Sequence, residues 1–367
     1  MSEENIKTGR TVFNQNNTGH ITKTYPMFFG DNLGMYDSVN ITNKNIEALK
    51  ELQRSMGWFP TEVSLSQDRS DMKTTSKDTV DLLVKTIMWQ SMTDSIASRS
   101  ISALLMPHVT NSEAESMIAE WARIEYVHAE TYLHIIKQTM PNPDGALLEA
   151  YRDLKIRARS QVLIDVFDNV YNMDINTPLE EKKELMAILL CTVMFMEGVS
   201  FMASFAVTFA IAETDVFQGI AENVGMIAKD EITHSLMSYE LIKACRDVDG
   251  WGEVFKRVKP RVKAIYDALV KGEEDWTDYL FSDGRSVVGL NASILKGCVH
   301  HFAGTCYGIV GIEAPFELVK ENPCTYMSNY LDRSLTQYAP QEMQHGSYRQ
   351  GSIVDDTEDD LDLDFSL

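Results

Sequence analysis

Cysteine is scarce in this 367-residue chain, and the five that occur follow no regular spacing. Their number is odd, and no two of them form a Cys-x-x-Cys motif. The pattern disfavours both a disulfide framework and a zinc ribbon, and it is typical of a protein kept in a reducing cytosol. The polar start MSEENIKTGR also lacks the apolar core of a secretory signal. We therefore expect a cytoplasmic protein.

Basic residues are few relative to acidic ones. Lys and Arg number 33 against 54 Asp and Glu, which gives a formal net charge of −21. Binding to nucleic acid needs a basic patch that neutralises phosphates, so we expect no nucleic-acid partner. Part of the acidity is concentrated in the C-terminal sequence VDDTEDDLDLDFSL. Such a run of like charges is typical of a disordered tail.

Turn-forming sequences are sparse, and neither a short repeat nor a glycine-rich phosphate loop is present. Long helical periodicity predicts an all-α chain. The expected helices cover about 77–106, 112 to just before Pro141, 177–212, 216–246, 251–271, 291–307 and 326–332. We predict a flexible N-terminal arm at 1–25, a helical domain at 26–335 and a flexible acidic tail at 336–367.

One segment has the length and composition of a membrane span. Residues 185–212 contain a single charged side chain, Glu197, over a length that would fit a bilayer. Several Ser and Thr residues dilute this segment, however, and the chain has no second span. A central helix buried on all sides is the better interpretation, and we expect no membrane partner.

Two Glu-x-x-His pairs lie on apolar helical stripes, Glu125 with His128 and Glu231 with His234. Residues three and four apart share a helix face, so the stripes that should be core carry carboxylates and imidazoles. Burying a carboxylate without a partner is very costly, and a metal ion is the obvious compensation.

Two further apolar helices contribute one acid each, Asp94 and Glu197. Four helices then offer inward carboxylates and two of them add a His, which is the arrangement of dinuclear sites in four-helix bundles. Four carboxylates would balance two divalent cations, and oxygen-rich ligation suits iron or manganese better than zinc or copper. The other histidines have no acid at ligand spacing and are expected to be ordinary surface or core residues: His20, His108, His134, His300, His301 and His345.

Tyr132 lies one turn beyond His128 on the same stripe, so its ring is expected beside the metal site. A tyrosine there could lose an electron and a proton if the metal pair activates dioxygen. The resulting radical would survive only where water and reductants are excluded. We expect Phe201, Phe205 and Ile227 to form the apolar wall around it.

Further motifs occur in order along the chain: PMFFG at 26–30, WFPTEV at 58–63, DWTDYLF at 275–281 and APQE at 339–342. With these motifs and the ligand pattern, the sequence resembles the small, radical-generating subunit of class I ribonucleotide reductase, most closely the class Ia type. The resemblance covers nearly the whole chain. It implies a ferritin-like helical bundle with additional helices, and an enzyme that is active only with a separate large catalytic subunit.

The resemblance also implies roles for individual residues. The implied metal ligands are Asp94, Glu125, His128, Glu197, Glu231 and His234, which would hold two iron ions per chain, with manganese possible. Tyr132 would carry the stable radical. Trp58, Asp230 and His128 match the relay from the cluster, and Tyr348 and Glu342 match residues of the tail that pass the radical on.

The implied reaction begins with dioxygen at the metal pair, which generates a radical on Tyr132. This radical is passed to the large subunit for the reduction of ribonucleotides to deoxyribonucleotides. The family forms homodimers, and its tail docks on the large subunit. A nucleotide pocket is not expected in this chain. The sequence departs from common family residues at Ile124, Gly198 and Lys229, where Ser, Ala and Arg are frequent.

Two other functions share the ligand pattern. A stand-alone ferritin-like oxidase of a small molecule would need neither Trp58 nor Tyr348. An iron-storage protein would favour a shorter bundle that closes into a shell, without a long acidic tail. A tyrosyl radical and binding to a large reductase subunit would separate both from the reductase hypothesis.

Overall fold

The computed structural model describes residues 11–23 and 25–332. Within these residues no β-strand forms, and only isolated bridges join Phe28 to Val109 and Val287 to Leu290. The predicted all-α class is thus confirmed. The predicted tail, with Glu342, His345 and Tyr348, and residues 1–10 and 24 of the predicted N-terminal arm lie outside the described residues, so the arm and tail boundaries stay predictions.

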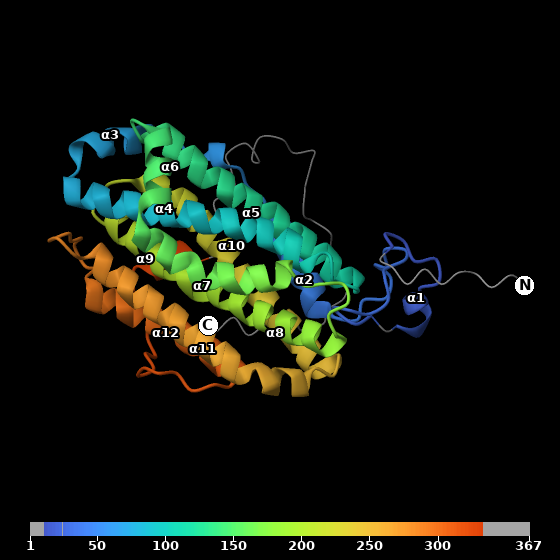
Figure 1. Cartoon of the computed structure of the whole chain (residues 1–367). Helices are drawn as coiled ribbons and strands as arrows, with labels where there is room; N and C mark the ends of the chain where they lie inside the picture. The colour runs from blue at the N-terminus through green and yellow to red at the C-terminus, as the bar shows by residue number, and fades with distance from the viewer. Residues whose placement is uncertain (1–10, 24, 333–367) are drawn as a thin grey trace, which may run out of the picture.

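The centre of the molecule consists of four long helical stretches (Figure 1). They are α4 (Lys77–Ser100), α5 (Ser112–Thr139), α10 (Gln218–Lys243), and the continuous run α8 (Leu179–Phe195), η3 (Met196–Ser200) and α9 (Phe201–Ala212). Helix α4 packs against α5 and α9, while α10 packs against α5, α8 and α9. Because each stretch contacts at least two others, a side chain on an inner face can meet side chains from the other three.

Further helices cover this centre on two sides. On one side lie α7 (Leu154–Tyr171), α11 (Gly252–Leu280) and α12 (Ala292–Val310), and on the other α2 (Lys44–Ser55) and α3 (Ser66–Thr74). Helix α11 packs against α7, α8 and α12, and α2 packs against α5 and α10. The shorter elements are α1 (Gly19–Thr22), η1 (Pro60–Glu62), η2 (Ile101–Leu105), α6 (Pro143–Arg152), η4 (Ala244–Val248) and α13 (Met327–Leu331).

The apolar segment with the length of a membrane span is a core helix. It runs over Leu179–Ala212, and 89% of its most apolar window is buried inside the protein. All residues of α9 are buried. A helix that is apolar on all sides needs such a complete cover of neighbouring helices in water, and α4, α10, α11 and α12 provide it.

Two predicted helix starts need correction. The pattern Ser112-x-x-Glu115 is that of a capping box and predicts Ser112 as the cap of α5. In the structure the side chain of Asn111 accepts the backbone N–H of Ala114 and caps α5, whose first residue is Ser112. Asparagine is as good a cap as serine, and it stands one residue earlier. Helix α8 begins at Leu179, with Pro178 as its cap residue.

Sequence reasoning also missed whole helices and one helix end. Helices α2, α3, α6 and α7 had not been predicted, and α11 continues to Leu280 rather than ending near residue 271. Three of the missed helices carry a recognisable start signal, which at α6 is Asn142, whose side chain accepts the N–H of Gly145. Asn43 accepts the N–H of Ile46 at the start of α2, and Asp153 accepts the N–H groups of Lys155 and Ile156 at the start of α7.

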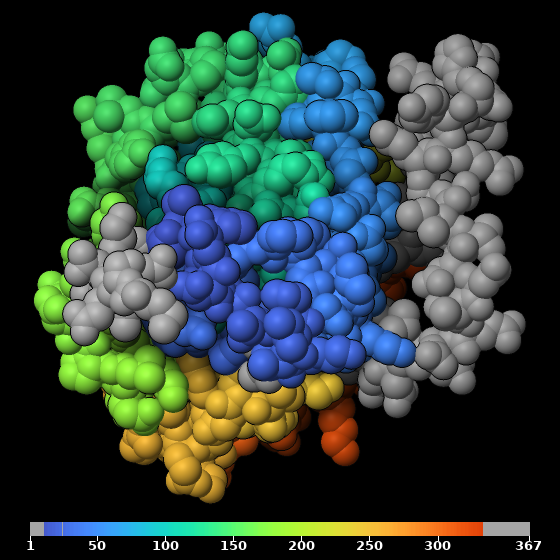
Figure 2. Space-filling view, turned by 90° about the vertical axis from the view of Figure 1, so that its right-hand side faces the viewer, coloured from blue at the N-terminus to red at the C-terminus, as the bar shows by residue number. Residues whose placement is uncertain are grey.

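The described residues before α2 lie at the end of the bundle where α5 begins. Figure 1 shows them in blue beyond this end, which faces the viewer in Figure 2. The backbone N–H of Met27 donates to Asp249 Oδ2 at 2.7 Å, and the Asn111 side chain donates to the Tyr25 carbonyl at 3.0 Å. These bonds join the chain entering the bundle to the start of α5 and to the turn after η4.

Candidate metal centre

Six buried side chains from the four central stretches face one another. Asp94 comes from α4, Glu125 and His128 from α5, Glu197 from η3, and Glu231 and His234 from α10; each has no exposed surface. They converge because each lies on the inner face of its helix. Among the described residues, ligand atoms of Glu125, His128, Glu231 and His234 lie within 4.8 Å of one another.

The carboxylates of Glu125 and Glu231 each lie close to both imidazoles. His128 Nδ1 is 3.0 Å from Glu231 Oε1 and 4.0 Å from Glu125 Oε2. His234 Nδ1 is 2.8 Å from Glu231 Oε2 and 3.0 Å from Glu125 Oε1. Asp94 lies on the His128 side, with Oδ1 at 3.6 Å from His128 Nδ1. Glu197 faces Glu231.

Much of the hydrogen-bonding capacity of this cluster is unused. The buried atoms without a hydrogen-bond partner include both oxygens of Asp94, both oxygens of Glu197, Glu125 Oε2 and His234 Nε2. Buried polar groups are normally satisfied, so a group of orphaned atoms pointing together needs an explanation. Oxygen-rich donors with two imidazole nitrogens fit two divalent ions of the iron or manganese type.

Without metal ions, the closely spaced carboxyl groups of the cluster shift one another's pKa values. Burial, together with the charges of Glu231 and Glu125, raises the pKa of Asp94 and of Glu197 well above the usual carboxyl range. Burial also acts to raise the pKa of Glu231, but the neighbouring His128 and His234 lower it overall. Bound cations would replace the protons that the bare site must hold, because metal ligands bind in their deprotonated form.

Neighbouring side chains orient two of these candidate ligands. Trp121 Nε1 donates to Glu125 Oε1 at 2.8 Å. His128 turns its other ring nitrogen, Nε2, to Asp230 Oδ2 at 3.1 Å. A carboxylate partner of this kind fixes the ring orientation of a metal-binding histidine.

The contacts of Asp230 continue away from the cluster. Trp58 Nε1 donates to Asp230 Oδ2 at 2.8 Å, and Gln53 Nε2 donates to Oδ1 at 2.8 Å. The structure thus brings Trp58, Asp230 and His128 together, as the resemblance implied. Gln53 was missed, because it lies on a helix that was not predicted and 177 residues from Asp230 in sequence.

Tyr132 lies fully buried beside the cluster. Its hydroxyl has no hydrogen-bond partner among the described residues. Burial and the charges of Asp94, Glu231 and Glu125 raise its pKa well above the usual phenol value, so the phenol keeps its proton at neutral pH. The expected wall residues Phe201, Phe205 and Ile227 are fully buried as well, and the rings of Phe201 and Phe205 stack at 5.9 Å.

Glu197 sits on a π-helical turn, which the sequence did not predict. The N–H of Phe201 bonds to the carbonyl of Met196, five residues back, and this bond closes η3. Such turns often occur at functional sites. The adjoining Gly198 allows α10 to approach, because a Cβ atom there would meet Ser235 Oγ at 2.8 Å.

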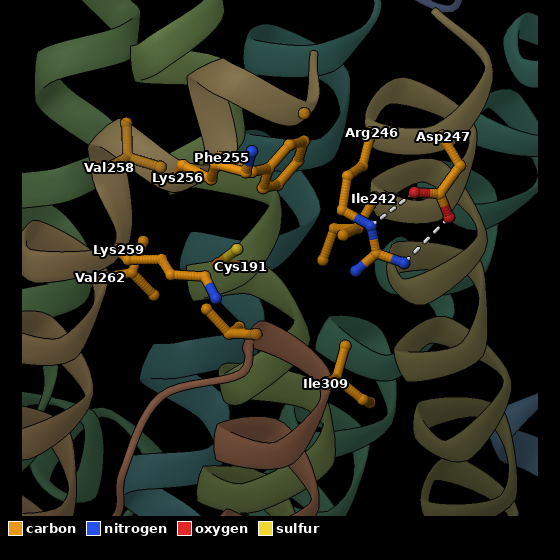
Figure 3. Close-up of a pocket in the computed structure, with 12 residues that line it drawn as sticks. Cys191, Ile242, Arg246, Asp247, Phe255, Lys256, Val258, Lys259, Val262 and Ile309 are labelled. Carbon is orange, nitrogen blue, oxygen red and sulfur yellow. Dashed lines mark hydrogen bonds and ion pairs between the residues drawn. The ribbon is translucent and has the colours of Figure 1, made fainter. Parts of the chain in front are cut away.

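His300, His301 and a cavity near the end of α10 lie apart from the cluster. His300 Nε2 is 2.9 Å from Glu274 Oε1, and His301 Nδ1 is 3.0 Å from the Val319 carbonyl. A cavity of about 300 Å³ is lined by Cys191, by the end of α10 with η4, and by α11 (Figure 3). Within it, Arg246 is paired with Asp247 through two hydrogen bonds.

Comparison with known proteins settles the family. The family model described as "Ribonucleotide reductase, small chain" matches residues 36–323. The chain belongs to the ribonucleotide reductase small-chain family. A ribonucleoside-diphosphate reductase subunit beta from Haemophilus influenzae is 30% identical, over 97% of this chain and 99% of its own length. The subunit beta of phage T4 is 26% identical, over 97% and 98%.

Solved structures show the same fold. A ribonucleotide reductase R2 subunit from Clostridium botulinum matches with a TM-score of 0.76 and 16% identity, over 88% of this chain and 98% of its own. A dimanganese(II)-NrdF from Streptococcus sanguinis matches with a TM-score of 0.62 and 17% identity, over 81% and 100%. The predicted ferritin-like bundle of the small chain is confirmed by these matches.

Replacing Glu231 with Ala should remove at least one of two bound metal ions, because Glu231 is the carboxylate closest to both imidazoles. Metal content per chain is measured after anaerobic iron loading and desalting. Glu240→Ala serves as the control, since Glu240 is a largely buried acid of α10 that pairs with Lys243. A Glu231→Ala protein that still binds two ions, with an unchanged absorption spectrum, would rule out this assignment.

Proposed function

We propose that this chain is the radical-generating small subunit of a class I ribonucleoside-diphosphate reductase, most similar to class Ia. The observation that carries the proposal is the buried cluster of four carboxylates and two imidazoles, linked through Asp230 to Trp58. Curated relatives along nearly the whole chain are named ribonucleoside-diphosphate reductase subunit beta. The diphosphate level of the substrate is taken from these relatives.

The proposed cofactor is a pair of iron ions per chain, with manganese as the alternative. It would be held by the six residues of the cluster, Asp94, Glu125, His128, Glu197, Glu231 and His234. When bound, the pair supplies the reaction with dioxygen that oxidises Tyr132. Glu125 and Glu231 each place oxygens near both imidazoles, so both would be among the residues that hold the pair.

Tyr132 is proposed to hold the oxidising equivalent. Its hydroxyl keeps its proton at neutral pH until it is oxidised, and oxidation then removes one electron and one proton. After burial, the charge of Asp94 is the largest neighbouring influence that raises the pKa of this phenol. The buried Phe201, Phe205 and Ile227 are proposed to keep water and reductants away.

Trp58, Asp230 and His128 are proposed to connect the cluster to the large subunit. Asp230 Oδ2 is within hydrogen-bond distance of both Trp58 Nε1 and His128 Nε2, so one carboxylate links the indole to the imidazole. Phe59, the residue after Trp58, is exposed. This link supports a reductase subunit over a stand-alone oxidase or an iron-storage protein, because neither of these needs a path for the radical out of the bundle.

The partner is proposed to be the large catalytic subunit, docked by the tail at 336–367, with Glu342 and Tyr348 in the transfer path. The chain is also proposed to form a homodimer, with an N-terminal arm at 1–25 and the dimetal domain at 26–335. All five cysteines are buried free thiols, which supports a reducing cytoplasmic location.

Tyr132→Phe should fold and assemble the metal pair, because it removes a hydroxyl that makes no hydrogen bond. It should show no stable tyrosyl radical and no reductase activity with the large subunit. The test is electron paramagnetic resonance, measured after anaerobic iron loading and exposure to air. Tyr266→Phe is the matched control, another fully buried tyrosine, whose hydroxyl donates to the Cys191 carbonyl. A radical signal that persists in Tyr132→Phe would place the radical on another residue.

Deleting residues 352–367 should leave the metal site and the Tyr132 radical intact but abolish binding to the large subunit. The alternation of Leu361, Leu363 and Phe365 with acids suits a segment that orders on a groove of another protein. Tyr348→Phe should have the opposite effect, with binding kept and turnover lost. A pull-down and a turnover assay are run on both variants. Normal complex formation by the truncated chain would show that docking occurs elsewhere.

A further inference from the structure

A buried ion pair outside the metal cluster touches the π-helical turn that carries Glu197. Arg159 of α7 and Glu273 of α11 are 5% and 2% exposed. Arg159 Nε donates to Glu273 Oε1 at 3.0 Å, and Nη2 donates to Oε2 at 2.6 Å. This two-pronged geometry fixes the plane of the guanidinium.

The remaining donors of Arg159 reach the central helix. Nη2 also donates to the carbonyl of Ser200 at 3.0 Å, and Nη1 donates to Ser204 Oγ at 2.9 Å. Ser200 is the last residue of η3, and Glu197 lies three residues before it. The guanidinium therefore holds a backbone carbonyl one helical turn from Glu197.

Glu197 depends on its backbone more than the other glutamates of the cluster do. Glu125 accepts a hydrogen bond from Trp121, and Glu231 lies against both imidazoles. Both oxygens of Glu197 lack a hydrogen-bond partner. The position of this carboxylate is consequently set by the turn on which it sits, and the Arg159 contacts act on that turn.

The same guanidinium packs on an aromatic side chain of α4. Its Cζ lies 3.3 Å from the centre of the Trp89 ring, and this ring lies 5.7 Å from the ring of Phe201. Phe201 follows Ser200 directly. Arg159 thus contacts both α4 and the η3–α9 stretch, and it joins them to the outer helices α7 and α11.

We propose that Arg159, fixed in its plane by Glu273, is a positioning residue that holds the turn η3 and thereby sets where the Glu197 carboxylate lies in the metal cluster. The proposal rests on one part of the proposed function, which is that the cluster binds metal. It assigns Arg159 no contact with the ions. Lysine could not replace Arg159. A guanidinium donates two parallel bonds to a carboxylate and reaches further acceptors in the same plane, whereas an ammonium group cannot.

The main test replaces both partners with methionine, as R159M combined with E273M. Replacing a complete buried ion pair with apolar side chains is often neutral for stability, so the apo protein should keep its melting temperature. Cobalt(II) is titrated anaerobically into the full chain, and its visible absorption reports the number and geometry of its ligands. We expect an altered spectrum and about tenfold weaker binding of one ion. A tenfold loss is the lower end of the usual effect of replacing a residue that orients a metal ligand.

Three further proteins make the result decisive. Glu197→Gln shows how the spectrum changes when this carboxylate is impaired, and the double variant should change it in the same direction. Arg159→Lys keeps the charge and should show the same change even if the double variant folds poorly. Arg285→Lys is the control, because Arg285 bonds to the carbonyl of Leu280 at the end of α11 and to Asp81, and its spectrum should match the wild type.

A cobalt spectrum and affinity like the wild type in both the double variant and Arg159→Lys would overturn the proposal, even if the melting temperature falls. In that case the ion pair would serve stability alone. A wild-type chain that binds no cobalt would instead contradict the proposed function, together with the inference that rests on it.

Discussion

The centre of this protein depends on one constraint: four carboxylates are enclosed in the core, and none of them has exposed surface. An ionised carboxylate in such surroundings is stable only when cations or hydrogen-bond donors compensate its charge. Donors reach only some of these oxygens, since Trp121 bonds to Glu125 while Asp94 and Glu197 have none. Two imidazoles supply part of the compensation. Bound cations would supply the rest, and this requirement would explain why acids from four separate helical stretches meet at one place.

The surrounding helices serve this site by excluding water and by limiting movement. The run from Met186 to Ala212 is buried except for a half-buried Gly198, so it can carry Glu197 into the cluster and keep solvent away from Tyr132. Side chains around the cluster then fix the orientation of the side chains in it, as the Asp230 carboxylate does for the imidazole of His128. A local departure from regular geometry, the π-helical turn η3, occurs where a ligand must be presented. Such departures from regular helix geometry are expected at functional sites, where the position of a functional side chain takes precedence over regular backbone structure.

The metal cluster could be predicted from the sequence because its signal is local. Glu125 with His128 and Glu231 with His234 repeat at helical spacing, and the periodicity of each stripe identifies the buried face. Contacts between distant residues leave no such signal: Gln53 meets Asp230 across 177 residues, and Arg159 meets Glu273 across 114. The π-helical turns also escaped prediction, because they depend on how the completed bundle packs.

The central claim, that the buried acids and imidazoles form a dinuclear metal site, is tested most directly by anomalous X-ray diffraction. Crystals of the iron-loaded chain are measured on both sides of the iron absorption edge, so that iron is distinguished from other scatterers. The account predicts two anomalous peaks per chain, enclosed by Asp94, Glu125, His128, Glu197, Glu231 and His234. A cluster that holds no iron, while ions occupy exposed acidic side chains instead, would contradict it.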